Sequence, residues 1–502
     1  MPRSRATRAS IRAVLRRSSA SRRSVRTRAG ATTWRSSSDA WRPARGAGPT
    51  TGGSPQRSPR SSRRPLPRRP TVEPNAVSGV VGVVGLSHLG IVTSAGLQSL
   101  GFTVTAVDAD ADAVKALAAG RPPVHEPGLA ELLARGAPAF TADYAALRGC
   151  GIVLVAADTV TDDHDRSELA PLEAHIDKVL PWLAGDAVLV LMSQVPVGYT
   201  RELAERLRAR RPDFRGPVHY WVETLVIGDA VARFRAPERI ILGGATAAWE
   251  PDPRLAALLA PFGCPVLRMS YESAELTKAA INLYLSTSLT FANALADLCE
   301  ASGASMRAIL PALRSDARIG PRAYIRPGLG IGGGNLERDL VNLRELAARL
   351  GVDGALLELI LASSRARYDW LTRSVERHLL AGRPQPRIAL WGLAYKKNTA
   401  STRNAPSLRL LADLRGRAQV VAYDPVARLP ADVVTAAASA LEAVRDADGL
   451  VVLTDWDEFA TQDLQAVRIA LRGPVVVDAV GVLDAARAGA AGLTYVAIGE
   501  PA

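Results

Sequence analysis

The sequence predicts an α/β protein in which two Rossmann-like, doubly wound domains are joined by a central all-helical domain. Short apolar runs alternate with helix-like segments from Val80 to about residue 265, as parallel strands and their crossover helices do. A long stretch with few helix breakers follows from Glu272 to Glu300, and the strand–helix alternation resumes after Pro384 and Pro386. The expected divisions are an N-terminal tail of residues 1–77 and domains of residues 78–267, 268–383 and 384–502.

The tail carries the basic character of the chain. Residues 1–77 contain 19 Arg and no Lys, against only Asp39 and Glu73, so the net charge of +13 for the whole chain leaves the remainder mildly acidic. The tail is rich in Arg, Ser and Pro and has almost no aliphatic periodicity, which predicts disorder. A nucleic-acid arm, a transit peptide and a start site placed too early, with translation beginning near Val72 or Val77, all fit this composition. We favour a disordered or artefactual tail and expect no nucleic-acid partner.

The composition of the body indicates a soluble protein of the cytoplasm. Hydrophobic residues make up 48% of the chain and charged residues 22%, and no apolar run approaches the ~18–20 residues that span a bilayer. The three cysteines, Cys150, Cys264 and Cys299, lack paired spacing, which favours a reducing compartment. The six histidines include no H-x-x-x-H pair, so no metal site is expected.

The first expected strand leads into the turn G-L-S-H-L-G, Gly85 to Gly90. Such a turn lets a dinucleotide approach the backbone at a helix N-terminus, here through Gly85, Ser87, Leu89 and Gly90. Asp108 ends the second expected strand, where a carboxylate accepts a hydrogen bond from a ribose 2′-hydroxyl and disfavours a 2′-phosphate. The pattern therefore predicts NAD as cofactor. The alternative is a glycine turn with a solvated aspartate.

Two further features carry candidate chemistry. Lys278 and Asn282 are four residues apart on the long expected helix, so they share a face and can together stabilise an alkoxide, or else lie on a solvated surface. In the run Leu329 to Asp339 the glycines are followed by Asn335, an amide that is neither nucleophilic nor titratable. Asp339 is placed to orient a lysine or a water, or alternatively to act as an acid near a helix N-terminus.

These segments together resemble the UDP-glucose/GDP-mannose dehydrogenase family over about residues 80–490. The resemblance rests on seven stretches in the family's order, no one of which is decisive. They are G-R-P-P-V-H-E-P-G-L (Gly120–Leu129), S-Q-V-P-V-G-Y-T (Ser193–Thr200), A-E-L-T-K…N (Ala274–Asn282), D-A-R-I-G (Asp316–Gly320), P-G-L-G-I-G-G-G (Pro327–Gly334), G-L-A-Y-K-K-N-T…R (Gly392–Arg403) and T-D-W-D-E-F (Thr454–Phe459).

Members of this family oxidise the C6 alcohol of a nucleotide sugar to a carboxylate with two NAD, and a cysteine adds to the intermediate aldehyde. The resemblance implies that a homodimer or higher oligomer forms through the helix from Glu272, with the sugar held between the two α/β domains. It also implies catalytic or oxyanion positions at Lys278, Asn282, Asp339 and Glu223, cofactor or interface positions at Thr159, Lys396 and Arg403, and sugar contacts at Tyr324, Gly330, Gly332 and Gly333.

The chain departs from the family pattern mostly on the sugar side. Asn335 stands at the position of the family cysteine and Arg338 at that of the following lysine. Ile227 replaces the second glutamate of the segment W-V-E-T-L-V-I-G, Val160 replaces the proline of a T-P pair, and D-A-V-G (Asp478–Gly481) lacks an arginine. Trp221 and Ile227 would make the sugar pocket more apolar, as a deoxy or acylated sugar would require.

Two classes of function remain open from the sequence. In the first, the protein is an NAD-dependent nucleotide-sugar dehydrogenase that oxidises the alcohol once and stops at the aldehyde or ketone, because an amide cannot form the thiohemiacetal. A variant of this reading has the aldehyde hydrate oxidised directly, with Asp339 or Glu223 as base. In the second, the protein is a non-catalytic homologue that binds NAD or a nucleotide sugar.

Overall fold

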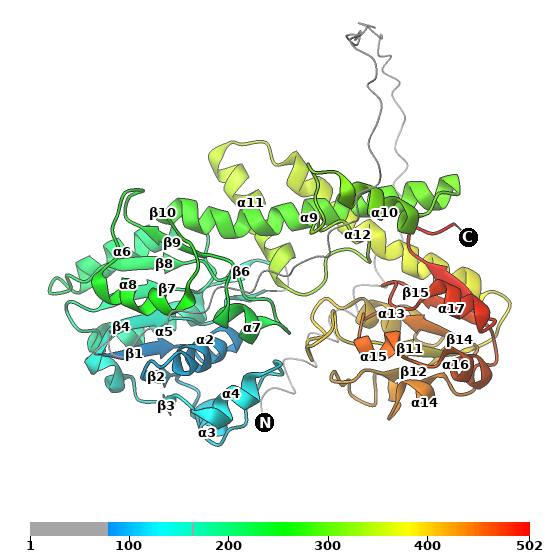
Figure 1. Cartoon of the computed structure of the whole chain (residues 1–502), viewed down its shortest axis with the longest axis horizontal. Coiled ribbons are helices and arrows are strands. Elements are labelled where there is room, and N and C mark those ends of the chain that lie inside the picture. Colours follow the sequence, from blue (N-terminus) through cyan, green and yellow to red (C-terminus); the bar gives the residue numbers. More distant parts are fainter. Residues whose placement is uncertain (1–78, 163–164, 502) are drawn as a thin grey trace, which may run out of the picture.

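The computed structural model describes residues 79–162 and 165–501, so the expected tail lies outside the described residues. Two lobes, each built on a sheet, stand side by side, and one long helix runs across both of them (Figure 1). The predicted fold class, two Rossmann-like domains and a central helical region, is confirmed.

The first lobe contains an eight-stranded sheet with the order β10-β9-β8-β7-β4-β1-β2-β3, parallel throughout except between β8 and β9. Its central strands are apolar runs buried on both faces, as a sheet covered by helices on either side requires, whereas the edge strands are more exposed. The strands are β1 (Val80–Val84), β2 (Val104–Val107), β3 (Ala139–Thr141), β4 (Cys150–Val155), β7 (Val188–Leu191), β8 (Val218–Trp221), β9 (Ile240–Gly244) and β10 (Val266–Ser270). A short hairpin, β5 (Val160–Thr161) and β6 (Ser167–Glu168), stands apart from it.

Helices cover this sheet on its two faces, over two separate hydrophobic clusters. They are α2 (His88–Ser99), α3 (Ala111–Ala118), α4 (Leu129–Arg135), α5 (Ala170–Val179), α6 (Tyr199–Arg210), α7 (Ala230–Arg235) and α8 (Pro253–Leu259), with 3₁₀ turns at Tyr144–Gly149, Leu180–Trp182 and Ala260–Phe262.

The central region is dominated by α9 (Tyr271–Ser302), the expected long helix. Ser270 caps its N-terminus by accepting from the backbone N–H of Ser273, and Gly303 ends it in the left-handed conformation with φ of 79°. Because 32 residues at about 1.5 Å per residue make a rod of nearly 50 Å, α9 reaches from one lobe to the other. It is accompanied by α10 (Met306–Ser315), α11 (Asn335–Leu350), α12 (Ala355–Val375) and a π-helical turn at Glu376–Leu380.

The second lobe contains a six-stranded parallel sheet with the order β13-β12-β11-β14-β15-β16. Its strands are β11 (Arg387–Trp391), β12 (Gln419–Tyr423), β13 (Thr435–Ala436), β14 (Gly449–Val452), β15 (Val475–Asp478) and β16 (Thr494–Ala497). Its helices are α13 (Pro406–Leu414), α14 (Ala440–Val444), α15 (Asp457–Ala460), α16 (Leu464–Ala470) and α17 (Ala485–Ala490).

The lobes touch through the loop that follows β11. Arg403 donates to the backbone oxygen of Thr161 at 3.0 Å, and the Asn398 amide lies 3.5 Å from the backbone oxygen of Gly228. These contacts join the carboxyl ends of the two sheets, the edge at which doubly wound folds bind ligands. Among the described residues, none of the helices has the length and apolar character needed to cross a membrane.

Candidate active site

The glycine turn after β1 packs directly against the end of β4. A Cβ atom on Gly85 would lie 2.7 Å from the Cβ of Ala157, and one on Gly90 would collide with the carbonyl oxygen of Gly85. Ser87 is the N-cap residue of α2, and Leu89 is buried in the first turn of that helix. The two glycines therefore allow the close backbone packing that a dinucleotide-binding turn requires.

Asp108 lies beside this turn at the end of β2. Its Oδ2 accepts from the backbone N–H of Leu86 at 2.5 Å and its Oδ1 from that of Asp110 at 2.9 Å. The side chain remains half-exposed. Its position next to the turn, with solvent access, fits an acceptor for a ribose hydroxyl.

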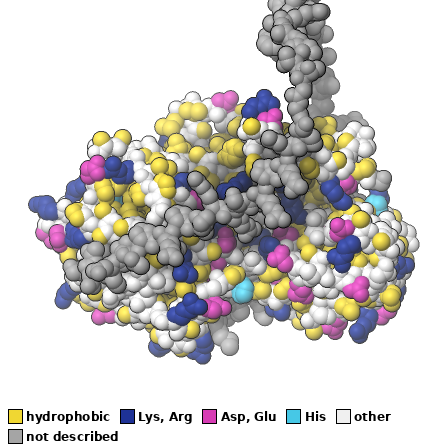
Figure 2. Space-filling view, viewed as in Figure 1, with side chains coloured by type: hydrophobic (Ala, Val, Ile, Leu, Met, Phe, Trp, Pro, Cys, Tyr) yellow, Lys and Arg dark blue, Asp and Glu magenta, His cyan; other side chains and the backbone are white. Residues whose placement is uncertain are grey.

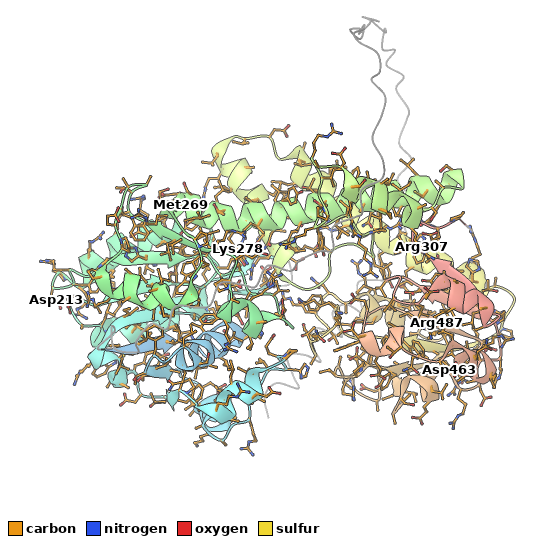
Figure 3. The ribbon with its side chains drawn as sticks, in the orientation of Figure 1. Asp213, Met269, Lys278, Arg307, Asp463 and Arg487 are labelled. Atoms are coloured by element: carbon orange, nitrogen blue, oxygen red, sulfur yellow. The ribbon has the colours of Figure 1, made fainter. Side chains whose placement is uncertain are left out.

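Lys278 points from α9 toward the loop that follows β8. Its Nζ lies 3.1 Å from Oε2 of Glu223, and the two side chains are only 10% and 15% exposed. Figure 3 places Lys278 near the middle of the molecule, on the side of α9 that faces the first lobe. The alternative of a solvated surface lysine therefore does not apply.

One helical turn further along α9, Asn282 is hydrogen-bonded to Asp339 of α11. The same carboxylate accepts a hydrogen bond from the Gln194 amide and lies 3.5 Å from Nε of Arg338. Asp339 and Arg338 are 2% and 3% exposed. Asp339 is thus a buried carboxylate with a donor on each oxygen and a guanidinium beside it.

Arg338 links this cluster to the cofactor side. Its guanidinium donates to the backbone oxygen of Thr159 at 2.7 Å and to the side-chain oxygen of Gln194. The Thr159 hydroxyl in turn donates to the backbone oxygen of Gln194 at 2.5 Å. The ends of β4 and β7 and the start of α11 are therefore held together by one buried polar network.

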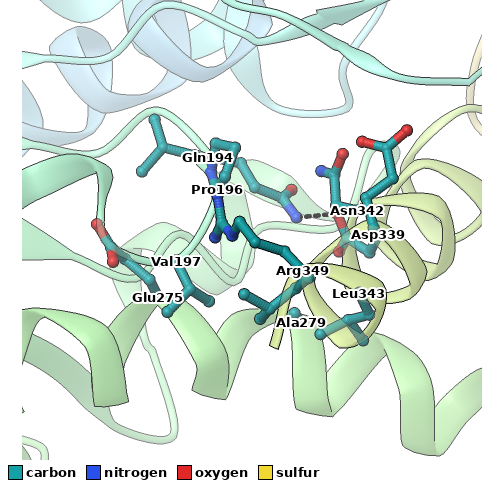
Figure 4. Close-up of a pocket in the computed structure, with 12 residues that line it drawn as sticks. Gln194, Pro196, Val197, Glu275, Ala279, Asp339, Asn342, Leu343 and Arg349 are labelled. Atoms are coloured by element: carbon teal, nitrogen blue, oxygen red, sulfur yellow. Dashed lines mark hydrogen bonds between the residues drawn. The ribbon is translucent and has the colours of Figure 1, made fainter. Parts of the chain in front are cut away.

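A cavity of about 250 Å³ borders Asp339 on the side of the loop after β7 (Figure 4). Gln194 and Pro196 form one wall, and Ala279 of α9 and Leu343 of α11 form others. Neither Lys278 nor Glu223 lines this cavity. The cavity therefore borders the polar network around Asp339 and does not reach the Lys278–Glu223 ion pair.

The glycine loop lies against the second lobe, and its last residue, Asn335, begins α11 with an exposed side chain. A Cβ on Gly333, where φ is 79°, would lie 2.9 Å from the ring of Tyr395, so only glycine fits there. Gly332 faces the same ring, and Gly330 packs on the backbone of Ser364. The loop thus presents Asn335 at the junction of the lobes.

None of the three cysteines belongs to the glycine loop itself. Cys299 lies 21 residues beyond Lys278 on α9, or about 30 Å along the helix. Cys150 begins β4, at the opposite end of the strand from Thr159, and burial raises the pKa of its thiol to about 11. Cys264 precedes β10, whose far end leads into α9.

The remaining candidate residues have different surroundings. Lys396 is half-buried, and its burial lowers the pKa of the ammonium while Glu126 of the first lobe acts against this. Tyr324 is exposed. The expectation that Trp221 lines the sugar pocket was wrong: it packs edge-on against Phe262 in the core of the first lobe.

Three further residues lie at the ends of strands or contact the loops around this network, and the sequence analysis assigned them no role. Gln194 and Asp158 follow β7 and β4, and Glu126 accepts from His88 at 2.8 Å and from the backbone N–H groups of Gly228 and Ala230. The position of Gln194 and Asp158 at carboxyl ends of parallel strands was a signal that could have identified them.

The fold and site define a two-lobed protein with a dinucleotide turn in one lobe and a buried lysine–carboxylate pair between that lobe and the long helix α9. Family comparison gives the same result: the NAD-binding domain of the UDP-glucose/GDP-mannose dehydrogenase family matches residues 80–262, its central domain residues 272–365 and its UDP-binding domain residues 389–485. The chain belongs to the UDP-glucose/GDP-mannose dehydrogenase family.

Its relatives span the same length. The UDP-glucose 6-dehydrogenase of Pseudomonas aeruginosa is 35% identical over 84% of this chain and 97% of its own, and TuaD of Bacillus subtilis, also a UDP-glucose 6-dehydrogenase, is 30% identical over 84% and 93%. A solved UDP-glucose dehydrogenase from Pyrobaculum islandicum superposes with a TM-score of 0.73 at 27% identity, covering 82% of this chain and 96% of that one.

Proposed function

We propose that the protein oxidises a UDP- or GDP-hexose at its primary alcohol with NAD and stops at the aldehyde. The observation that carries this proposal is the combination of a buried Lys278–Glu223 pair with an amide, Asn335, at the end of the glycine loop. The first feature serves the oxidation of an alcohol, and the second removes the nucleophile needed to go further.

In this proposal the ion pair handles the proton of the substrate hydroxyl. The Lys278 ammonium donates a hydrogen bond to the sugar oxygen as negative charge develops on it, and Glu223, 3.1 Å from the ammonium, accepts the hydroxyl proton. When bound, NAD supplies the acceptor for the hydride from the carbinol carbon. The products balance as aldehyde, NADH and one proton.

Asp339 has a positioning role. Asn282 and Gln194 donate to its two oxygens, and Arg338 lies beside it, so its lone pairs and charge are already engaged. Its function is to fix the start of α11 against α9. If the aldehyde hydrate is oxidised directly, the base for that step is Glu223, which has fewer partners.

A second candidate function is a non-catalytic homologue that binds NAD or a nucleotide sugar. Asn335 favours it, since the family's covalent chemistry is lost. The buried and hydrogen-bonded Lys278, Asn282 and Asp339 favour the enzyme, because this polar network would be costly to keep in an unused pocket.

Purified full-length protein mixed with NAD and a panel of UDP-, GDP- and TDP-sugars distinguishes the two. Reduction of NAD by at least one sugar, with an aldehyde trapped by hydroxylamine, supports the dehydrogenase. NAD binding measured by calorimetry without reduction by any sugar supports the non-catalytic protein.

We further propose that α9 forms the core of a homodimer. Four large apolar side chains, Leu276, Tyr284, Phe291 and Leu298, are 43–65% exposed and recur at seven- or eight-residue spacing along one face. Hydrophobic side chains gather along the top of the molecule, over the helical region (Figure 2). Light scattering should report a dimer for the native chain and a smaller species for Leu298→Glu, whereas Leu441→Glu, at an exposed leucine of the second lobe, should leave the size unchanged.

A further inference from the structure

The dinucleotide turn contains a histidine whose ring is bonded to another part of the first lobe. His88 follows Ser87 in the turn and is the first residue of α2. A diphosphate at this helix end would be held by the backbone N–H groups of the first helical turn, to which His88 belongs. The imidazole is half-buried, and its Nε2 lies 2.8 Å from Oε2 of Glu126. The backbone that would hold the cofactor is therefore tied to a carboxylate outside the turn.

Glu126 anchors the loop that follows β8. Its side chain is fully buried, and its two oxygens accept from the backbone N–H groups of Gly228 and Ala230, each at 2.8 Å. Burial acts to raise the pKa of this carboxyl, but the hydrogen bonds to its oxygens outweigh burial and lower the pKa. Because an ionised carboxylate only accepts hydrogen bonds, His88 donates to it through Nε2. One buried carboxylate thus joins the dinucleotide turn to the loop after β8.

The same loop carries Glu223. One oxygen of Glu223 lies 3.1 Å from Nζ of Lys278, and the other accepts from the backbone N–H of Leu225 within the loop. The second lobe touches the loop at Gly228, where φ is 87° and a Cβ atom would lie 2.7 Å from the Cβ of Asn398. The direction in which the Glu223 carboxylate points therefore depends on how firmly this loop is held.

We propose that His88 is a positioning residue that links occupancy of the dinucleotide turn to the loop carrying Glu223. A diphosphate that fixes the first turn of α2 also fixes the imidazole, and through Glu126 it restrains the backbone from residue 223 to residue 230. NAD binding thereby orders the carboxylate beside Lys278. The link itself concerns only the cofactor site, whereas its effect on a reaction rests on the proposed oxidation.

The test is hydrogen exchange of the full-length protein with and without NAD, followed by mass spectrometry on a peptide covering residues 223–230. Saturation with NAD is checked for each variant by calorimetry. NAD should slow exchange of this segment in the native protein about tenfold, the change that about 1.4 kcal/mol of added local stability produces. His88→Phe keeps a ring but removes both nitrogens, so the response to NAD should be lost. His88→Gln keeps an N–H group that can reach Glu126 and should restore the response.

The matched control is His175→Phe. His175 of α5 is half-buried like His88, and its Nδ1 lies 2.8 Å from the hydroxyl of Tyr144 in the same lobe. This variant should keep the native response to NAD. An equal response in His88→Phe and the native protein overturns the proposal, as does the absence of any response in the native protein. Should His88→Phe fail to fold, Glu126→Gln breaks the same link from its other end and decides by the same criterion.

A second readout separates this proposal from the proposed oxidation. With a sugar that the native protein oxidises, His88→Phe should lower kcat about tenfold, as the loss of one hydrogen bond to a charged group does, and His88→Gln should recover it. Full kcat in His88→Phe would overturn the positioning role. If the native protein oxidises no sugar, the proposed oxidation has failed, and the exchange experiment still decides whether the link exists.

Discussion

The two lobes begin with the same pattern, a buried strand, a glycine, a helix and a second strand followed by an acid, but the two acids have opposite surroundings. Asp108 of the first lobe is half-exposed and accepts two backbone hydrogen bonds. Asp424 of the second lobe is 2% exposed. It accepts from the backbone N–H groups of Leu393, Ala394, Val426 and Ala427 and from the indole N–H of Trp456.

The difference originates in the connection after the first strand. In the first lobe α2 begins at His88, directly after the glycine turn. In the second lobe the chain forms a long loop after Gly392 before α13 begins at Pro406, and this loop contacts Gly333, Thr161 and Gly228 of the rest of the protein. The same pattern therefore leads directly into a helix in the first lobe and into a loop that contacts the rest of the protein in the second.

The largest expected effect concerns the buried acid. Asp424→Ala leaves five donors without their acceptor and should lower the free energy of unfolding by about 3–5 kcal/mol, the usual loss when a buried charged partner is removed. Asp108→Ala, at the open acid, should cost less than half of that. Urea unfolding of the two variants checks this, and equal losses would show that the lobes do not differ as described.

We expect the oxidation to depend on Lys278 of α9 more than on Asp108 or Asp424. Lys278→Met removes the ammonium beside Glu223 and should lower the rate of NAD reduction by about 10²–10³, as the loss of one oxyanion donor does. NAD affinity should change little. Lys115→Met, an exposed lysine of α3, is the matched control. Native-like rates from Lys278→Met would remove the pair from the mechanism.

The lobes should also differ in their response to acid. His219 of β8 is buried against Trp249, and burial lowers the pKa of its imidazole from 6.5 to about 4, although Asp252 acts in the opposite direction. The second lobe, residues 384–502, has no histidine. Between pH 6.5 and about 4, His219 binds a proton in the unfolded chain but stays neutral in the folded lobe. The contribution of the neutral His219 to stability is therefore fully present above pH 6.5 and is lost progressively as the pH falls to about 4.

The loss attributable to His219 is about 3 kcal/mol across that range, because each pKa unit corresponds to about 1.4 kcal/mol. His219→Phe should flatten the fall of the melting temperature between pH 6.5 and 4. His125→Gln, at an exposed histidine of the same lobe, should not. An unchanged acid profile for His219→Phe would assign the sensitivity to other groups.

The smallest expected effect is on cofactor affinity. Asp108→Asn weakens an acceptor for the ribose hydroxyl and should raise the dissociation constant of NAD about tenfold, which matches a lost hydrogen bond to a charged group. Asp112→Asn, an exposed charge on α3, gives the baseline for neutralising an acid in this lobe. Identical affinities for both variants would contradict the assignment of Asp108.

Periodicity and local spacing were enough to predict the fold class, the long helix and the common face of Lys278 and Asn282. Periodicity and spacing depend on residues that are close together in the sequence, so they can be read from the sequence directly. The partners of Asp339 and Arg338 lie elsewhere: Gln194 and Thr159 are 144–179 positions away, and only the fold brings them together. Trp221 was misassigned because it ends a strand, where one residue of register decides between core and crevice.

The number of NADH molecules formed per sugar consumed tests the central claim most directly. With purified protein and a sugar it accepts, one NADH per sugar and an aldehyde product are expected, because the glycines of the loop are followed by Asn335 and the loop contains no cysteine. Asn335→Cys should move the count toward two, with the acid as product. Two NADH per sugar and a carboxylate product from the native protein would contradict the account.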